Sequence, residues 1–238
     1  MFILPTYKRP EKLRDFVGYA RDFGMTAPVL VMVQGEENLP AYKPVLEELP
    51  ENWKWLCLQH NIGMVAAFNM AFASNPNLDW YGCLGDDMLP KTERFDHKCL
   101  SLLEPYSIIS CSDETADGYW RAAGINIMSG PLVRACGFMY PPCTWHICGD
   151  DWLQLVGKSF GIWRVATDVI VSNTGFLTTG KQQDETQKEA YKDFGNQIMQ
   201  YHRWLAEHGG DVMERIRVQM MAAGLMPAEG VSRWRVSK

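Results

Sequence analysis

The chain has 238 residues, of which 47% are hydrophobic and 21% are charged, and its formal net charge is −5 at pH 7. This length fits one large domain or one domain with an appendage, and the composition is that of an ordinary globular protein with a sizeable core. The acidic balance excludes a general electrostatic attraction to nucleic acid or anionic membranes, although a local basic patch stays open. No apolar run approaches the ~20 residues of a membrane span and no signal peptide precedes the first strand, so we expect a cytoplasmic protein.

The seven cysteines are odd in number and scattered, which indicates reduced thiols and not a disulfide framework. Zinc could be bound by Cys136, Cys143, His146 and Cys148, but their spacing lacks the paired knuckle of structural zinc sites. Free, mostly buried cysteines are the better interpretation.

Short apolar runs alternate with amphipathic segments over the first two-thirds of the chain. Strands are predicted at 2–4, 27–33, 54–59 and 79–84, and helices at about 10–24, 41–48 and 64–73. In the first of these helices, Leu13, Phe16, Val17 and Ala20 recur at helical spacing. The alternation predicts an α/β protein with a mostly parallel sheet and helices on its faces.

The pattern loosens after residue 107, where apolar stretches at 107–113 and 122–130 precede a helix at 149–161 and a strand at 163–173. A polar stretch follows residue 176, then helical segments near 185–208 and 211–223, and then a basic tail. We expect a domain over 1–175 and a small C-terminal helical extension over 176–238.

Polar groups follow each of the first four predicted strands, and Asp86 and Asp87 follow the fourth. Ligands bind outside the carboxyl ends of such strands, and oxygen ligands on a rigid strand end suit magnesium or manganese. A solvated turn would also explain the pair, but its place at a strand end favours function.

A second acidic pair, Asp150 and Asp151, begins a predicted helix. Carboxylates at a helix start satisfy free N–H groups, so capping is a sufficient structural reason. We predict that Asp150 lies where a cap belongs and that Asp151, in the first turn, is free to act as a general base.

Three further places combine a polar residue with a turn. Asn61 and Gly63 open a helix straight after a strand, a ready place for phosphate or ribose contacts, although a simple turn is the default. Arg9 lies in the turn after the first strand, and Trp120 and Trp145 lie in loop-like stretches beside Arg121 and His146. Aromatic rings there can stack on sugars or bases, although core filling is their commoner use.

Four motifs in order resemble those of family-2-like glycosyltransferases with the GT-A fold, a Rossmann-like α/β fold. They are "ILPTYKRPEKL", "HNIGMVAAFNMAF", "WYGCLGDDMLP" and "CGDDWLQLVGKSFGIWRVATDVIV". The likeness covers about residues 1–175, and each motif is weak alone.

The resemblance implies a nucleotide-sugar donor, UDP- or GDP-linked, and a divalent Mn²⁺ or Mg²⁺. It places Asp87 on the metal and makes Asp151 the catalytic base of an inverting transfer. The nucleotide-sugar would contact Pro5, Thr6, Arg9, Gln34, Asn61, Gly63 and Asp86. We expect Trp120, Trp145 and Asp150 to contact the acceptor.

The chain departs from the family pattern at three positions. Gln34 replaces an acidic residue after the second strand, Gly85 replaces the first Asp of an Asp-x-Asp motif, and Asn173 stands where a histidine is common. These three positions bear on the base contact, the nucleotide identity and part of the metal site that the resemblance implies.

The acceptor stays open. A modified nucleic-acid base is one option, with phosphates meeting basic residues near the C-terminus, although such residues are usually just solvated. They are Arg215, Arg217, Arg233, Arg235 and Lys238. The alternatives to a glycosyltransferase are a nucleotidyltransferase, for which no glycine-rich loop is present, and a non-catalytic nucleotide- or sugar-binding module.

Overall fold

The computed structural model describes residues 1–113, 125–174 and 184–225. Its strands are β1 (Phe2–Thr6), β2 (Val29–Gln34), β3 (Lys54–Leu58), β4 (Trp80–Cys83), β5 (Met88–Pro90), β6 (Ile108–Asp113), β7 (Asn126–Ser129) and β8 (Trp163–Asn173). Its main helices are α1 (Pro10–Asp22), α2 (Leu39–Leu46), α3 (Met64–Ser74), α4 (Phe95–Ser101), α5 (Gly130–Cys136), α6 (Gly149–Phe160), α8 (Glu185–Tyr191), α9 (Phe194–Trp204) and α10 (Gly210–Ala222). A 3₁₀ turn, η1 (Glu36–Asn38), precedes α2, and a π-helical turn, η2 (Leu205–Gly209), joins α9 to α10.

The strands form one sheet in the order β3-β2-β1-β4-β7-β6-β8-β5. β1 pairs in parallel with β2 and β4, and β2 pairs in parallel with β3. The carboxyl ends of the first four strands therefore meet at one rim, as the sequence predicts. The sheet as a whole is mixed, because β7 runs antiparallel to β4 and β6, and β5 runs antiparallel to β8.

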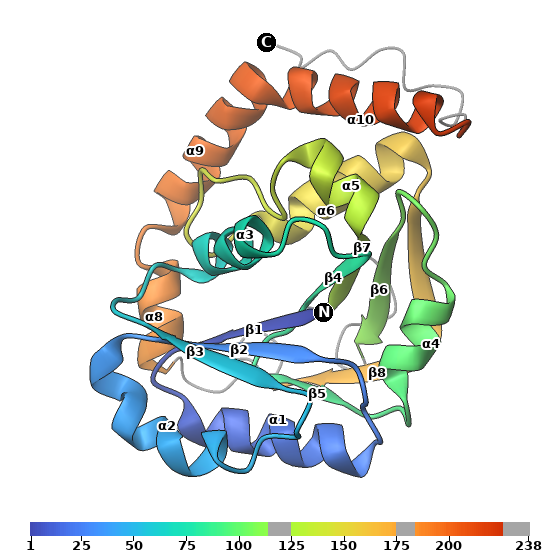
Figure 1. Cartoon of the computed structure of the whole chain (residues 1–238). Coiled ribbons are helices and arrows are strands. Elements are labelled where there is room, and N and C mark those ends of the chain that lie inside the picture. Colours follow the sequence, from blue (N-terminus) through green and yellow to red (C-terminus); the bar gives the residue numbers. More distant parts are fainter. Residues whose placement is uncertain (114–124, 175–183, 226–238) are drawn as a thin grey trace.

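Helices cover both faces of the sheet, which confirms the predicted α/β class. In Figure 1, α1 and α2 lie below the sheet, α3, α5 and α6 lie above it, and α9 and α10 lie outside this upper layer. The strands carry apolar residues on both faces, as expected of a sheet buried on both sides. On β1, Phe2 and Leu4 belong to the lower core, and Ile3 belongs to the upper core.

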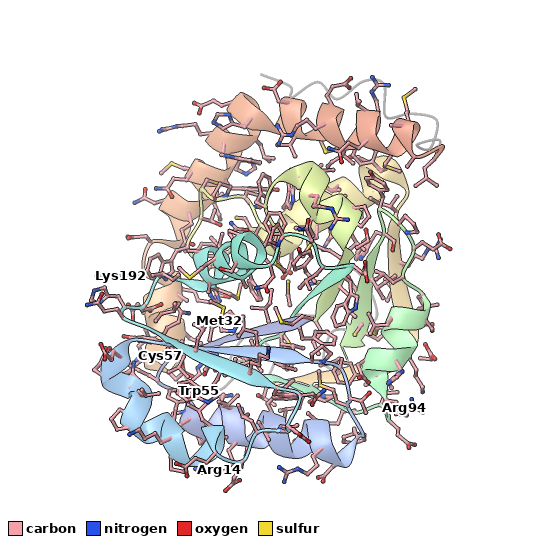
Figure 2. The ribbon with its side chains drawn as sticks, viewed as in Figure 1. Arg14, Met32, Trp55, Cys57, Arg94 and Lys192 are labelled. Atoms are coloured by element: carbon pink, nitrogen blue, oxygen red, sulfur yellow. The ribbon has the colours of Figure 1, made fainter. Side chains whose placement is uncertain are left out.

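Side chains fill the space between sheet and helices on both faces (Figure 2). Met32 of β2 is fully buried in the upper core, whereas Trp55 of the edge strand β3 is 47% exposed. The upper core also includes Tyr201 of α9 and Ile216 of α10. The C-terminal helices therefore share a core with the sheet domain. Within the described part of the chain, no helix is both long enough and apolar enough to cross a membrane.

Candidate active site

Asp86 and Asp87 follow β4 at the rim, and both contact Arg9, in the turn after β1. The Asp86 carboxylate is buried and accepts hydrogen bonds from Thr6 Oγ1 at 2.8 Å and Arg9 Nη1 at 3.0 Å. The Asp87 carboxylate is 19% exposed and lies 3.5 Å from the same Nη1. The main-chain oxygen of Asp87 accepts a bond of 2.8 Å from the N–H of Thr174, just beyond β8.

Arg9 is shared among three carboxylates. Its Nη2 also lies 2.9 Å from the carboxylate of Asp184, immediately before α8. Burial raises the pKa of Asp86 to about 6, although Arg9 and Thr6 act to lower it. Burial disfavours the charge of Arg9, but its acidic partners outweigh this effect and raise its pKa. One guanidinium facing three carboxylates leaves a surplus of negative charge that a bound cation would relieve.

One donor of Arg9 is unused. Its Nε–H is buried and has no hydrogen-bond partner among the described residues. A buried, unpaired N–H costs free energy comparable to a lost hydrogen bond. The site therefore has a donor in place for an acceptor atom such as a phosphate oxygen.

A second group of predicted residues lies at the ends of β2 and β3. Gln34 is buried, and its side-chain oxygen accepts a bond of 2.9 Å from the N–H of Ile62. Asn61 accepts from the N–H of Gly63 at 3.0 Å. Gly63 has a φ of +82°, and a Cβ there would lie 2.6 Å from the ring of Trp145. Only glycine fits this turn, so local packing is a sufficient reason for the glycine of the Asn-x-Gly pattern.

The loop that carries Trp145 is fixed from the C-terminal region. The buried side-chain oxygen of Gln197, on α9, accepts bonds from the N–H groups of Trp145 at 3.1 Å and His146 at 2.9 Å. The His146 ring packs edge-on against Tyr191 of α8. Burial lowers the pKa of His146 to about 4, with Asp87 close enough to oppose the shift. His146 is therefore neutral at pH 7 and lies toward the acidic rim.

α8 closes one side of the rim. Besides the contact of Asp184 with the guanidinium, Thr186 donates a 2.7 Å bond to the main-chain oxygen of Tyr7. Asn61 donates to the carboxylate of Glu189 at 3.4 Å. α8 is thus tied to the segments that follow both β1 and β3.

Asp150 lies over the end of β4. Its carboxylate accepts a bond of 3.3 Å from Asn126 of β7. Asn126 is the register partner of Cys83, three residues before Asp86. Asp150 is therefore brought to the rim that carries the first acidic pair.

The predicted cap of this helix is wrong. α6 begins at Gly149, its N-cap is Cys148 with a φ of +66°, and no side chain caps it. Asp150 and Asp151 both lie in the first turn, where the helix dipole favours them. Asp151 is exposed and lies near Tyr201 of α9, whose pKa is raised by burial and then by the Asp151 charge.

The remaining predicted positions are placed as follows. Pro5 lies within β1 beside Met32 in register, and Trp120 lies outside the described residues. Gly85 closely adjoins the metal candidate, because a Cβ there would lie 2.9 Å from the Asp87 carboxylate. Asn173 pairs in register with Met88, the residue after Asp87.

The sequence does not predict four residues in these roles: Tyr42, His146, Asp184 and Gln197. Tyr42, Asp184 and Gln197 each contact a site segment from a distant part of the chain. His146 lies beside the predicted Trp145, and Asp184 begins a D-x-x-Q capping pattern, but neither signal predicts the contact that the residue makes.

The donor atoms at the rim suit a hydrated magnesium or manganese ion better than a closed metal cage. Among the described residues, no group of three or more His, Cys, Asp and Glu side chains could hold a metal ion. Mg²⁺ commonly binds one or two carboxylates and completes its shell with water and substrate phosphates. The partly exposed Asp87 can provide one such carboxylate.

The fold is that of the GT-A glycosyltransferases, a mixed sheet with helices on both faces. The mannosyltransferase PcManGT from Pyrobaculum calidifontis, in complex with GDP-Man and Mn²⁺, is similar at 14% identity and a TM-score of 0.58, over 94% of this chain and 74% of that one. Residues 1–349 of S. aureus TarS, in complex with UDP-GlcNAc, match at 12% identity and a TM-score of 0.59, over 93% and 72% of the two chains. GalNAc-T7 with UDP, GalNAc and Mn²⁺ matches at 10% identity and a TM-score of 0.57, over 72% of this chain and 43% of that one. No protein-family model and no curated protein sequence matches the chain.

Proposed function

We propose that this chain is a glycosyltransferase that moves a hexosyl or pentosyl group from a UDP- or GDP-sugar to an acceptor hydroxyl, with inversion. The cluster of Arg9, Asp86 and Asp87 at the carboxyl ends of parallel strands carries the proposal. Open α/β sheets bind their ligands at this edge. The similar solved structures contain GDP-Man, UDP-GlcNAc or UDP with GalNAc, which supports a nucleotide-sugar as the donor.

In this proposal the donor diphosphate lies at the rim. Asp87 would hold Mn²⁺ or Mg²⁺, and the unused Nε–H of Arg9 would donate to a phosphate oxygen. The metal, when bound, stabilises the charge that develops on the departing diphosphate. Pro5, Thr6, Gln34, Asn61 and Gly63 form the remainder of the nucleotide-sugar site.

The transfer is a single displacement. We assign Asp151 as the general base, because Asp150 is engaged by Asn126 and Asp151 is exposed one residue further along the first turn. The Asp151 carboxylate takes the proton of the acceptor hydroxyl, and the oxygen of that hydroxyl bonds to the anomeric carbon. The bond from that carbon to the diphosphate breaks, and a nucleoside diphosphate leaves.

The acceptor side is assigned to Trp145, Asp150 and the part of α9 that carries Tyr201. Asp151 lies near Tyr201, so this part of α9 lies beside the proposed base. A nucleic-acid acceptor has less support than the sequence suggested. Arg215 donates to the main-chain oxygen of Cys136, and Arg217 pairs with Glu214, so both have internal partners. Arg233, Arg235 and Lys238 lie outside the described residues.

The test is a thermal-shift panel of UDP- and GDP-sugars with MnCl₂, followed by product analysis of each stabilising donor. A ligand at a hundred times its dissociation constant stabilises by roughly 2.7 kcal/mol, which such a panel detects. Release of a nucleoside diphosphate in an amount equal to the sugar lost from the donor supports the proposal. Release of pyrophosphate would make the chain a nucleotidyltransferase. Binding without turnover, with any of a range of acceptors, would make it a non-catalytic binding module.

A further inference from the structure

The hydroxyl group of Tyr42 contacts two residues of the site. Tyr42 lies on one face of the sheet, and α6 lies on the other. Tyr42 is on α2 and is fully buried. Its oxygen accepts a bond of 2.8 Å from the main-chain N–H of Arg9 and lies 2.8 Å from Thr6 Oγ1. Arg9 is the N-cap of α1, so its N–H has no partner within the helix, and Tyr42 supplies one.

The directions of these hydrogen bonds follow from counting protons. Thr6 Oγ1 donates its single proton to Asp86 at 2.8 Å, because an ionised carboxylate only accepts. Thr6 must then accept from Tyr42, which itself accepts from Arg9. The result is one chain of donors, from the Arg9 N–H through Tyr42 and Thr6, that ends on Asp86. Bonds aligned in this way polarise one another.

Both ends of this chain belong to the same ion pair. The second oxygen of Asp86 accepts from Arg9 Nη1, so the network runs from the main chain of Arg9 back to its own side chain. We propose that Tyr42 is a positioning residue, which fixes the Asp86 carboxylate through Thr6 and fixes the turn that carries Arg9. This role rests on the proposed function, in which Arg9, paired with Asp86, contacts the nucleotide diphosphate.

The test is the Tyr42→Phe variant of the full chain, titrated by calorimetry with UDP and with GDP in the presence of MnCl₂. Phenylalanine keeps the ring in the core and removes the hydroxyl alone. We expect the affinity for the preferred nucleotide to fall about tenfold, the size of one typical hydrogen bond.

Tyr81→Phe is the matched control. Tyr81 is also fully buried, and its hydroxyl also accepts one main-chain N–H, from Leu78, and donates to one main-chain oxygen, of Asn75. These partners flank the start of β4, away from the rim. Tyr81→Phe should lower the melting temperature to a similar extent and leave nucleotide affinity unchanged.

A second pair of variants tests the route through Thr6 if Tyr42→Phe does not fold. Thr6→Val breaks the chain and should lose affinity, and Thr6→Ser, which restores the hydroxyl, should recover the affinity that Thr6→Val loses. If Tyr42→Phe, or Thr6→Val in its place, binds nucleotide as the parent does, the positioning role is wrong and the proposed function stands. If the parent chain binds neither UDP nor GDP with manganese, the proposed function is wrong and the positioning role falls with it.

Discussion

At the scale of single residues, the acidic rim depends on the shape of one guanidinium. Arg9 bonds Asp86 and Asp87 through one terminal nitrogen and Asp184 through the other. A lysine could place one charge there, but it has no planar fork to hold carboxylates on two sides. The two adjacent aspartates are tolerated because one is paired and buried while the other keeps an exposed edge.

The first prediction at this scale concerns the exposed edge of the Asp87 carboxylate. Asp87→Asn should abolish the manganese-dependent stabilisation by nucleoside diphosphate, because an amide is a far weaker ligand for a hard cation. The fold should persist, since the main-chain bond to Thr174 does not involve the carboxylate. Thermal shifts with UDP or GDP, with and without MnCl₂, measure the effect. If the variant responds to manganese as the parent does, Asp87 is not the metal ligand.

The second prediction separates the carboxylates of α6. A general base typically contributes 10²–10⁴-fold in rate, so Asp151→Asn should lose that factor in single-turnover transfer with donor affinity unchanged. Asp150→Asn should keep most of the rate, because its carboxylate is engaged by Asn126. Should the Asp150 variant be the inactive one, the two roles are exchanged.

At the scale of elements, α8 connects the C-terminal region to the rim. Asp184 is its N-cap and forms a capping box with Gln187, while the same carboxylate pairs with Arg9. One residue therefore both starts the helix and joins it to the site.

These two functions of Asp184 can be separated by substitution. Asparagine still caps a helix, so Asp184→Asn removes the ion pair alone. Because the Asp184 side chain is 38% exposed, the loss in free energy of unfolding should stay below ~1 kcal/mol. Asp184→Ala removes the cap as well and should cost about 1 kcal/mol more. Urea unfolding measures both, and equal losses in the two variants would show that the capping box contributes nothing.

The sequence predicts long elements well and short or nonlocal features poorly. The predicted strand 163–173 coincides with β8, and the rim after the first four strands forms as expected. β5 has three residues, and α4 and α5 have seven each, too few to show a period. Capping rules placed a cap at Asp150 because Cys148, in a left-handed conformation, matches no capping preference.

The same limit applies to the site. Pattern alone predicts Asp86 and Asp87, because strand ends converge in a parallel sheet. In the sequence, Tyr42 resembles a core aromatic residue of α2. Its role depends on contacts with Arg9, 33 positions away, and Thr6, 36 positions away. Such contacts are set by tertiary packing, which the local sequence does not express.

At the scale of the whole molecule, the C-terminal helices belong to the main core. Ile216 of α10 is fully buried, and its cluster includes residues of α3, α5 and α6. Arg215 joins the same helix to the end of α5 through a bond of 2.9 Å to the oxygen of Cys136. The division at residue 175 is therefore not a division of the core.

We predict that the chain unfolds in one cooperative transition and that Ile216→Ala lowers its free energy of unfolding by ~2–5 kcal/mol. Val218→Ala is the control, because Val218 lies on the same helix and is 50% exposed. This variant should change the free energy of unfolding by no more than about 0.5 kcal/mol. Far-ultraviolet circular dichroism and tryptophan fluorescence should report the same midpoint. Two separate midpoints would mean that the helices fold as a unit of their own.

The ion pair between Arg9 and Asp184 joins residues 175 positions apart, which sets an order of events during protein synthesis. Arg9, Asp86 and Asp87 leave the ribosome well before Asp184. At about 5–20 residues per second, roughly 5–20 s separate the appearance of Asp87 from that of Asp184. During this interval the segments of the nascent chain that form the rim lack Asp184 and α8, so the pair between Arg9 and Asp184 is among the last contacts of the site that can form.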